Sequence, residues 1–213
     1  MTRWEQASGE PGPERGRAYA ARFEALAATG TDVHGEATLA ATLVPVPARV
    51  LDAGCGTGRV AIRLAEMGYE VVGVDADEAM LEVARGQAPE LAWSLGDLAQ
   101  LDLVLAEPAT FDLVIAAGNV IPLLEAGTEQ SVLSALAGRL HPAGLLLAGF
   151  GLDAAHLPIP QATLSLSMYD LICRQAGLNL VQRWSTWDRQ PYDGGGYAVS
   201  LHRRAAGLPA LSD

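Results

Sequence analysis

From residue 49 onwards, short apolar runs of the chain alternate with segments whose apolar positions recur at helical spacing. The apolar runs predict five strands, at 49–53, 69–74, 91–95, 111–116 and 145–150. The segments between them predict helices at 58–67, from 77 through 83, at 128–140 and at 164–176. Strands that are apolar on both faces and alternate with helices are typical of a parallel sheet with helices packed on both sides.

Two further strands are predicted near the C-terminal end, at 178–186 and 197–202. The ten residues between them, which include three consecutive glycines, leave no room for a crossover helix, so these strands should pair antiparallel. The pattern therefore predicts an α/β fold: a doubly wound, seven-stranded, mostly parallel sheet that ends in an antiparallel strand pair.

The N-terminal part follows a different pattern. Residues 1–16 are rich in Gly, Pro and Glu and predict a disordered tail, and 17–28 and 35–44 predict two alanine-rich helices. Because small side chains bury little area, we expect 17–44 to form a helical lid on a single domain that spans 17–204. Residues 205–213 are expected to be a flexible C-terminal tail.

Composition narrows the range of partners. The 213 residues are 50% hydrophobic and carry a net charge of −11, with 14 basic side chains against 25 acidic ones. Such a balance disfavours a nucleic-acid substrate and favours a small molecule. The apolar stretches are too short to cross a membrane, and the first residues lack the apolar core of a signal peptide, so a cytoplasmic location is expected. The oligomeric state is left open.

The two cysteines, Cys55 and Cys173, cannot form a disulfide framework. Neither has a second Cys or His at metal-ligand spacing, so no metal site is expected.

A glycine-rich loop is the strongest chemical signal. The strand 49–53 leads directly into Gly54, Gly56 and Gly58, and a helix follows. Glycines allow the backbone to approach a ligand closely, and the N-terminus of the helix offers unpaired N–H groups. The spacing G-x-G-x-G differs from the G-x-G-x-x-G of dinucleotide-binding proteins. About twenty residues further on, Asp75 ends the next strand, where an acidic group can bind ribose hydroxyls.

Four motifs in order resemble the class I S-adenosylmethionine-dependent methyltransferases, whose fold is Rossmann-like. They are Asp52-Ala53-Gly54-Cys55-Gly56-Thr57-Gly58, Val74-Asp75, Gly96-Asp97-Leu98 and Phe111-Asp112-Leu113-Val114. The resemblance covers roughly residues 48–150. It implies S-adenosyl-L-methionine as the cofactor and is nearly silent on the methyl acceptor.

The resemblance also implies roles for individual residues. The backbone of Gly54 and Gly56 would lie against the methionine part of the cofactor, and Asp52 would lie near its ammonium group. Asp75 would bind both ribose hydroxyls, while Ala76, Met80, Asp97 and Leu98 would surround the adenine. The complete set of cofactor-binding candidates is Asp52, Gly54, Cys55, Gly56, Gly58, Asp75, Ala76, Met80, Gly96, Asp97, Leu98, Ala117 and Gly118.

Two residues are candidates for contact with the acceptor. His34 lies between the two N-terminal helices, and an imidazole is the side chain that most often acts as a general base; the bland alternative is an exposed turn residue before a helix that Asp32 caps. Asn119 follows the fourth strand and either orients the substrate or caps the next segment. Methyltransferases that act on amines of nucleic acids or proteins often carry Asp/Asn-Pro-Pro followed by an aromatic residue at this position. That motif does not occur here.

The sequence therefore predicts a methyltransferase that acts on an unidentified, small-molecule acceptor. Two alternatives stay open at this point: a cofactor-binding regulatory protein without catalysis, and a nicotinamide-dependent oxidoreductase on a similar sheet.

Overall fold

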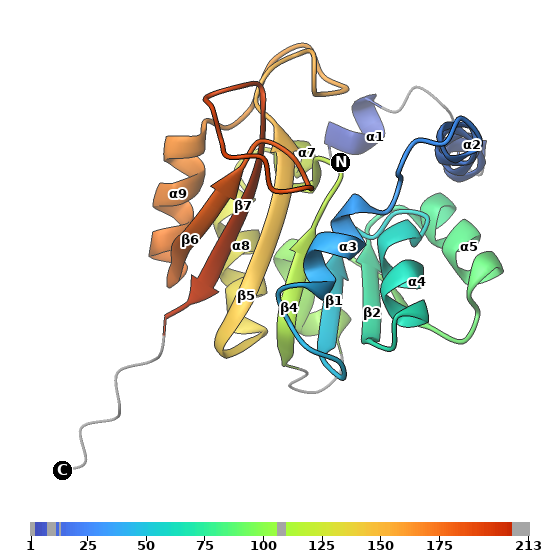
Figure 1. Cartoon of the computed structure of the whole chain (residues 1–213), viewed down its shortest axis with the longest axis horizontal. Helices are drawn as coiled ribbons and strands as arrows, with labels where there is room; N and C mark the ends of the chain where they lie inside the picture. The colour runs from blue at the N-terminus through green and yellow to red at the C-terminus, as the bar shows by residue number, and fades with distance from the viewer. Residues whose placement is uncertain (1–2, 8–11, 13, 106–109, 206–213) are drawn as a thin grey trace.

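The computed structural model describes residues 3–7, 12, 14–105 and 110–205. A single seven-stranded sheet runs through the molecule in the order β3-β2-β1-β4-β5-β7-β6 (Figure 1). Its strands are β1 (Arg49–Ala53), β2 (Glu70–Asp75), β3 (Ala92–Leu95), β4 (Phe111–Ala116), β5 (Leu140–Gly151), β6 (Leu178–Trp184) and β7 (Tyr197–Arg204). The first five pair in parallel, and β7 pairs antiparallel with both β5 and β6. The predicted fold class is confirmed.

Helices cover both faces of the sheet. On one face, α3 (Gly35–Ala41) and α4 (Arg59–Glu66) pack against the inner strands. On the other face lie the 3-10 helix η1 (Leu98–Gln100), α6 (Leu101–Val104), α7 (Val120–Leu123), α8 (Glu129–Gly138) and α9 (Leu166–Gln175). The helix α5 (Glu78–Gln87) follows β2 and packs beside β3. This arrangement is the doubly wound layering that the sequence pattern predicts.

The N-terminal segment differs from the expectation. Within 1–16, expected to be a disordered tail, the structure describes helix α1 (Arg3–Ala7) and the start of α2 (Glu14–Ala28). Both lie above the ends of the strands in Figure 1, with α1 beside α7 and α2 above α5. Ala205 is described, and the remainder of the expected C-terminal tail lies outside the described residues.

Strand β5 is longer than predicted. It begins at Leu140, so that His141 and Pro142, which read as the end of a helix, lie inside the strand. The pairing with β4 shifts register between Phe111 and Leu113, and this irregularity accommodates a proline that cannot donate to the ladder.

Strand β7, the last strand of the chain that the structure describes, is an interior strand of the sheet. It lies between β5 and β6, and His202 is only 1% exposed. Burial lowers the pKa of His202 to about 4, so this side chain is a neutral part of the core.

Candidate functional site

A cavity of about 870 Å³, including its open mouth, lies at the carboxyl ends of β1, β2 and β4. Since β1 and β4 are neighbours whose connections leave in opposite directions, this is the point of a doubly wound sheet where ligands bind. The cavity is lined by Trp4, Tyr19, Asp52, Gly54, Cys55, Gly56, Thr57, Arg59, Val60, Asp75, Ala76, Met80, Leu98, Ala117, Gly118, Val120 and Leu123.

The glycine loop forms the floor of the cavity. Gly54 and Gly56 have φ of 75° and 56°, a region that side chains disfavour. A Cβ on Gly54 would lie 2.5 Å from a methyl carbon of Val120, and a Cβ on Gly56 would lie 3.1 Å from the methyl carbon of Met80. The backbone is therefore bare where it faces the cavity, as close contact with a ligand requires.

Asp75 ends β2 at the wall of the cavity. Its Oδ2 accepts a hydrogen bond from the N–H of Gly56 at 2.7 Å, and its Oδ1 accepts one from the N–H of Asp77 at 2.9 Å. Each carboxylate oxygen can accept a second hydrogen bond, so two neighbouring hydroxyls of a ligand fit this group. Burial raises the pKa of Asp75 to about 6, and the two backbone donors oppose that rise.

Asp52 lies deeper, next to the last residue of β1, and is 2% exposed. Its carboxylate accepts a hydrogen bond of 3.0 Å from the N–H of Ala61 in α4. Burial raises the pKa of Asp52 to about 7, against the attraction of the Arg59 guanidinium. A buried carboxylate at a cavity wall is stabilised by a cationic ligand group, since an unpaired buried charge is costly.

Arg59 begins α4 and joins the glycine loop to the N-terminal helices. Its guanidinium donates to both carboxylate oxygens of Glu36, at 2.9 and 2.5 Å, and to the carbonyl of Val33. It also lies over the ring of Phe23, 4.4 Å from the centroid. Burial opposes the charge of Arg59, but the hydrogen bond and the charge of Glu36 raise its pKa above the ordinary value.

Helices α1 and α2, which we call the outer cover, close the cavity from above. The indole of Trp4 and the guanidinium of Arg15 both donate to Asp77 Oδ2, at 2.9 and 2.7 Å, and Asp77 caps α5. Gly16 lets helix α2 approach helix α5 closely, because a Cβ there would lie 2.0 Å from the carbonyl oxygen of Ala79.

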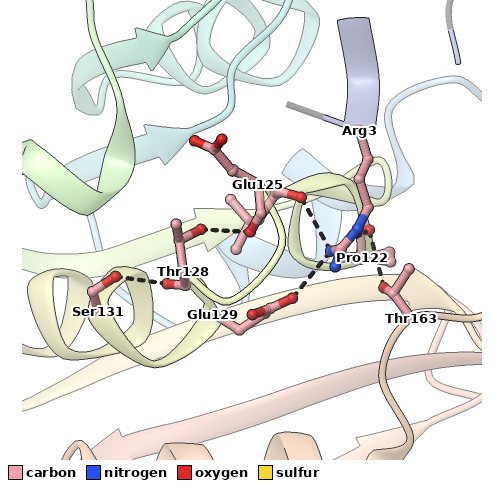
Figure 2. A network of polar contacts seen from close by, with 8 residues as sticks. Arg3, Pro122, Glu125, Thr128, Glu129, Ser131 and Thr163 are labelled. Carbon is pink, nitrogen blue, oxygen red and sulfur yellow. Dashed lines mark hydrogen bonds and ion pairs between the residues drawn. The ribbon is translucent and has the colours of Figure 1, made fainter. Parts of the chain in front are cut away.

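The other end of the outer cover is fixed by Arg3. Figure 2 shows its guanidinium among groups at the start of α8 and the end of α7. It donates to the carbonyls of Pro122 and Leu124, at 3.4 and 3.1 Å, and to a carboxylate oxygen of Glu129 at 3.0 Å. Helix α1 thus spans the cavity from α7 to α5.

The structure brings most of the sequence-predicted cofactor residues to this cavity. Those that line it are Asp52, Gly54, Cys55, Gly56, Asp75, Ala76, Met80, Leu98, Ala117 and Gly118.

Three predicted residues lie outside the lining. A Cβ on Gly58 would lie 2.6 Å from the Trp93 ring, and one on Gly96 would lie 2.1 Å from Val104, so both glycines serve packing. Asp97 accepts a hydrogen bond from the N–H of Ala99 at 2.8 Å and thereby caps η1.

The two candidates for contact with the acceptor also lie outside the lining. His34 precedes α3, its N–H donates to Asp32, and its Nδ1 is buried without a hydrogen-bond partner among the described residues. The Asn119 amide accepts from the N–H of Gly151 at 2.7 Å and donates to the carbonyl of His156 at 3.0 Å. Asn119 therefore ties the loop after β4 to the end of β5.

Sequence reasoning missed part of the lining: Trp4, Thr57, Arg59, Val60, Val120 and Leu123. Thr57 and Arg59 belong to the glycine motif itself and were within reach of a closer reading. Trp4 and Leu123 come from short helices without a periodic pattern, so nothing local marks them. Tyr19 of α2 also lines the cavity.

Comparisons with known proteins agree with this geometry. A family model described as a methyltransferase domain matches residues 50–144. A TehB-like SAM-dependent methyltransferase from Corynebacterium glutamicum is similar over 90% of this chain and 99% of its own, with 30% identity and a TM-score of 0.79. The CcbJ methyltransferase from Streptomyces caelestis is similar over 81% of this chain and 89% of its own, with 26% identity and a TM-score of 0.70. The chain belongs to the class I S-adenosylmethionine-dependent methyltransferase superfamily.

Curated relatives share a shorter segment. The magnesium-protoporphyrin O-methyltransferase of Rhodobacter capsulatus is 35% identical over 100 residues, which are 45% of this chain and 42% of that protein. The glycine N-methyltransferase of Rattus norvegicus is 36% identical over 113 residues, 46% of this chain and 39% of that protein. The chain thus spans about two fifths of the length of the curated relatives it matches.

In the part of the chain that the structure describes, no helix is long and apolar enough to cross a membrane. The same residues contain no group of three or more His, Cys, Asp or Glu side chains that would hold a metal ion.

Proposed function

We propose that this protein is a methyltransferase that binds S-adenosyl-L-methionine in the cavity at the β1, β2 and β4 ends and transfers its methyl group to a small-molecule acceptor. One observation carries the proposal: a glycine floor lies between the buried carboxylate of Asp52 and the half-buried carboxylate of Asp75. The distribution of groups matches a ligand with an ammonium at one end and a pair of ribose hydroxyls further along.

We assign the parts of the cofactor to the lining as follows. The ribose hydroxyls donate to the free lone pairs of Asp75, and the ammonium group lies toward Asp52. The adenine lies between Ala76, Met80 and Leu98, whose side chains line the same end of the cavity. Gly58, Gly96 and Asp97 shape the loops that carry these residues and do not themselves contact the ligand.

The bound cofactor supplies a methyl group on a positively charged sulfur. The glycine loop, Asp52 and Asp75 would hold this donor in place; the acceptor would supply the lone pair for the new bond and lose a proton, and the electron pair of the broken carbon–sulfur bond would stay on sulfur. Because the leaving thioether is neutral, the contribution of this chain is mainly alignment and the exclusion of water.

The relatives support a small acceptor and leave its nucleophilic atom open. By their names, one methylates oxygen of a magnesium porphyrin and another methylates nitrogen of glycine. The negative net charge of this chain, −11, agrees with an acceptor that is not a nucleic acid.

Calorimetry with S-adenosylhomocysteine tests the cofactor assignment. Asp75→Ala should weaken binding by about 1.5–3 kcal/mol, the scale of hydrogen bonds to a charged group. The control is Glu70→Ala, an exposed acid at the opposite end of β2, which should bind as the wild type does. Equal affinity of Asp75→Ala and wild type, with the fold intact by circular dichroism, would contradict the ribose assignment.

Two further measurements separate the alternatives. Binding of NAD in place of S-adenosylhomocysteine would favour an oxidoreductase. Binding of S-adenosyl-L-methionine without formation of S-adenosylhomocysteine, across a broad panel of small-molecule acceptors, would favour a regulatory protein.

A further inference from the structure

One wall of the cavity is not used by the cofactor assignment. It is formed by Trp4 of α1, Tyr19 of α2, and Val120 and Leu123 of α7. The rings of Trp4 and Tyr19 meet edge to face, with centroids 5.7 Å apart. This wall is aromatic and aliphatic, and such surfaces bind apolar, flat molecules.

No cationic side chain that lines this cavity is free to bind an anionic acceptor, and the exposed Arg22, whose charge acts on Tyr19, lies outside the lining. Among the residues that line it, Arg59 is the single cationic side chain, and both of its terminal nitrogens are engaged by Glu36. The other two charged residues of the lining, Asp52 and Asp75, are carboxylates. Once the cofactor occupies Asp52 and Asp75, an acceptor with a carboxylate or phosphate would therefore find no counter-ion among the lining residues.

The Tyr19 hydroxyl is the polar feature of the wall. It lies 3.7 Å from the position that a Cβ on Gly118 would occupy, at the switch point of the sheet. Among the residues that the structure describes it makes no hydrogen bond, although Tyr19 is half-buried. Burial raises the pKa of Tyr19, so the hydroxyl stays neutral and can accept from, or donate to, a ligand group.

Building on the proposed function, we propose that this wall is the acceptor subsite and that it takes a flat, apolar molecule without negative charge, whose hydroxyl or amino group forms a hydrogen bond with Tyr19. Trp4, Val120 and Leu123 hold the apolar body of the acceptor. The Tyr19 hydroxyl directs the nucleophilic oxygen or nitrogen toward the loop of Ala117 and Gly118. Arg3 keeps the two halves of the wall together, because it bonds the carbonyls on either side of Leu123 and neighbours Trp4.

Matched naphthalene probes test the proposal on the full chain saturated with S-adenosylhomocysteine. The three probes are 2-naphthol, 2-naphthylmethylamine and 2-naphthoate, which share one ring system and differ in charge and hydrogen bonding. Calorimetry should show that 2-naphthol and the amine bind and that 2-naphthoate binds at least about tenfold more weakly.

Two variants locate the probe. Tyr19→Phe keeps the ring and removes the hydroxyl, so it should weaken 2-naphthol binding by about five- to tenfold, the scale of one buried hydrogen bond. Trp4→Ala should weaken both binding probes. As a matched control, Trp187→Ala changes an indole that lies outside the cavity lining and should leave probe affinity unchanged.

Several outcomes would overturn the acceptor assignment: tighter or equal binding of 2-naphthoate, wild-type affinity of Tyr19→Phe for 2-naphthol, or no binding of either uncharged or cationic probe. S-adenosylhomocysteine binding is measured first in every variant. If the wild type does not bind S-adenosylhomocysteine, the proposed function itself is contradicted. If the cofactor binds and the probes do not, only the acceptor assignment is contradicted.

Discussion

Helices α2 and α3 have similar alanine-rich sequences and opposite relations to the core. In α2, the only buried residue is Gly16, and its outer side chains face solvent. In α3, Ala37, Leu39 and Ala40 are buried against the sheet, each at most 3% exposed. The segment 17–44, predicted to be one lid, thus contains a covering helix and a helix that belongs to the core layer.

The difference lies in what holds each helix. Helix α3 is held by the burial of apolar area, which is spread over several of its side chains. The outer cover rests on a few polar contacts around Asp77 and Glu129 and on one close backbone approach at Gly16. Elements held by few contacts are those that open locally, so we expect any opening of the site to occur at α1 and α2.

Hydrogen exchange gives the largest expected contrast. In the free protein, the amides of α2 should exchange at least about a thousandfold faster than those of α3 and β4, because local opening costs little where burial is small. S-adenosylhomocysteine should slow exchange in α2 and leave α3 unchanged. Equal protection of the two helices in the free protein would show that both are permanently packed.

Stability should respond to α3 and not to α2. Leu39→Ala removes a side chain that is 3% exposed and should lower the free energy of unfolding by about 2–4 kcal/mol. Leu26→Ala, on α2 with Leu26 37% exposed, should change it by less than about 0.5 kcal/mol. Urea denaturation measures both, and comparable losses would remove the distinction between the helices.

Acid should release the ligand before it releases the outer cover. Burial raises the pKa values of Asp75 and Asp52 to about 6 and about 7, so both carboxylates lose charge as the pH falls through this range. Affinity for S-adenosylhomocysteine should therefore drop by about tenfold or more between pH 7.5 and pH 5.5.

Asp77, which anchors the outer cover, has a pKa shifted in the opposite direction. Burial would raise the pKa of Asp77, but hydrogen bonds from Arg15 and Trp4 outweigh it and lower the pKa below the ordinary value. A lowered carboxyl pKa contributes stability above the unfolded value of 3.8, and this contribution is lost only at lower pH. Calorimetry from pH 5 to 8 measures the affinity, and tryptophan fluorescence extended below pH 3.8 follows the loss of the outer cover. A pH-independent affinity would contradict the proposed role of the carboxylates.

A substitution at Gly16 should have an intermediate effect on the affinity for S-adenosylhomocysteine. Gly16→Val places a side chain where the Ala79 carbonyl lies, so α2 must move away from α5. We expect S-adenosylhomocysteine to bind about tenfold more weakly with little change in melting temperature, since α2 contributes little buried area. Ala27→Val, an exposed site on the same helix, carries the same β-branched penalty and should bind normally.

The smallest effect is expected from Arg3. Arg3→Ala removes a partly buried ion pair to Glu129, with side chains 20% and 14% exposed, together with two bonds to carbonyls. Dissociation of S-adenosylhomocysteine should become about threefold faster in stopped-flow fluorescence. The control is Arg17→Ala, whose ion pair with Glu14 is fully at the surface, with side chains 67% and 66% exposed. Identical rates in both variants would show that α1 does not limit release.

The sequence predicted the sheet well because its signals are local. The apolar runs at β1, β2 and β4 and the glycines after β1 identify themselves without knowledge of distant residues. The start of β5 was placed at residue 145 because His141 and Pro142 are typical of the break after a helix, whereas the strand begins at Leu140 and its pairing with β4 shifts register between Phe111 and Leu113.

The missing parts of the site depend on tertiary contacts. Nothing around Trp4 indicates that its indole meets Asp77, 73 positions away. Conversely, Gly58 and Gly96 carry the motif spacing, yet their neighbours Trp93 and Val104 show that they are needed for packing. Motif spacing therefore locates the loop and does not separate ligand contacts from packing positions.

The placement of β7 between β5 and β6 has a consequence for synthesis on the ribosome. Strand β6 leaves the ribosome first, but its only strand neighbour is β7, which follows it in the chain. Until β7 arrives, β6 cannot join the sheet, and the edge of β5 stays open to pairing with other chains. Slow translation between Trp184 and Tyr197 would prolong that exposure, whereas rapid delivery of β7 covers the edge of β5 and joins β6 to the sheet in one step.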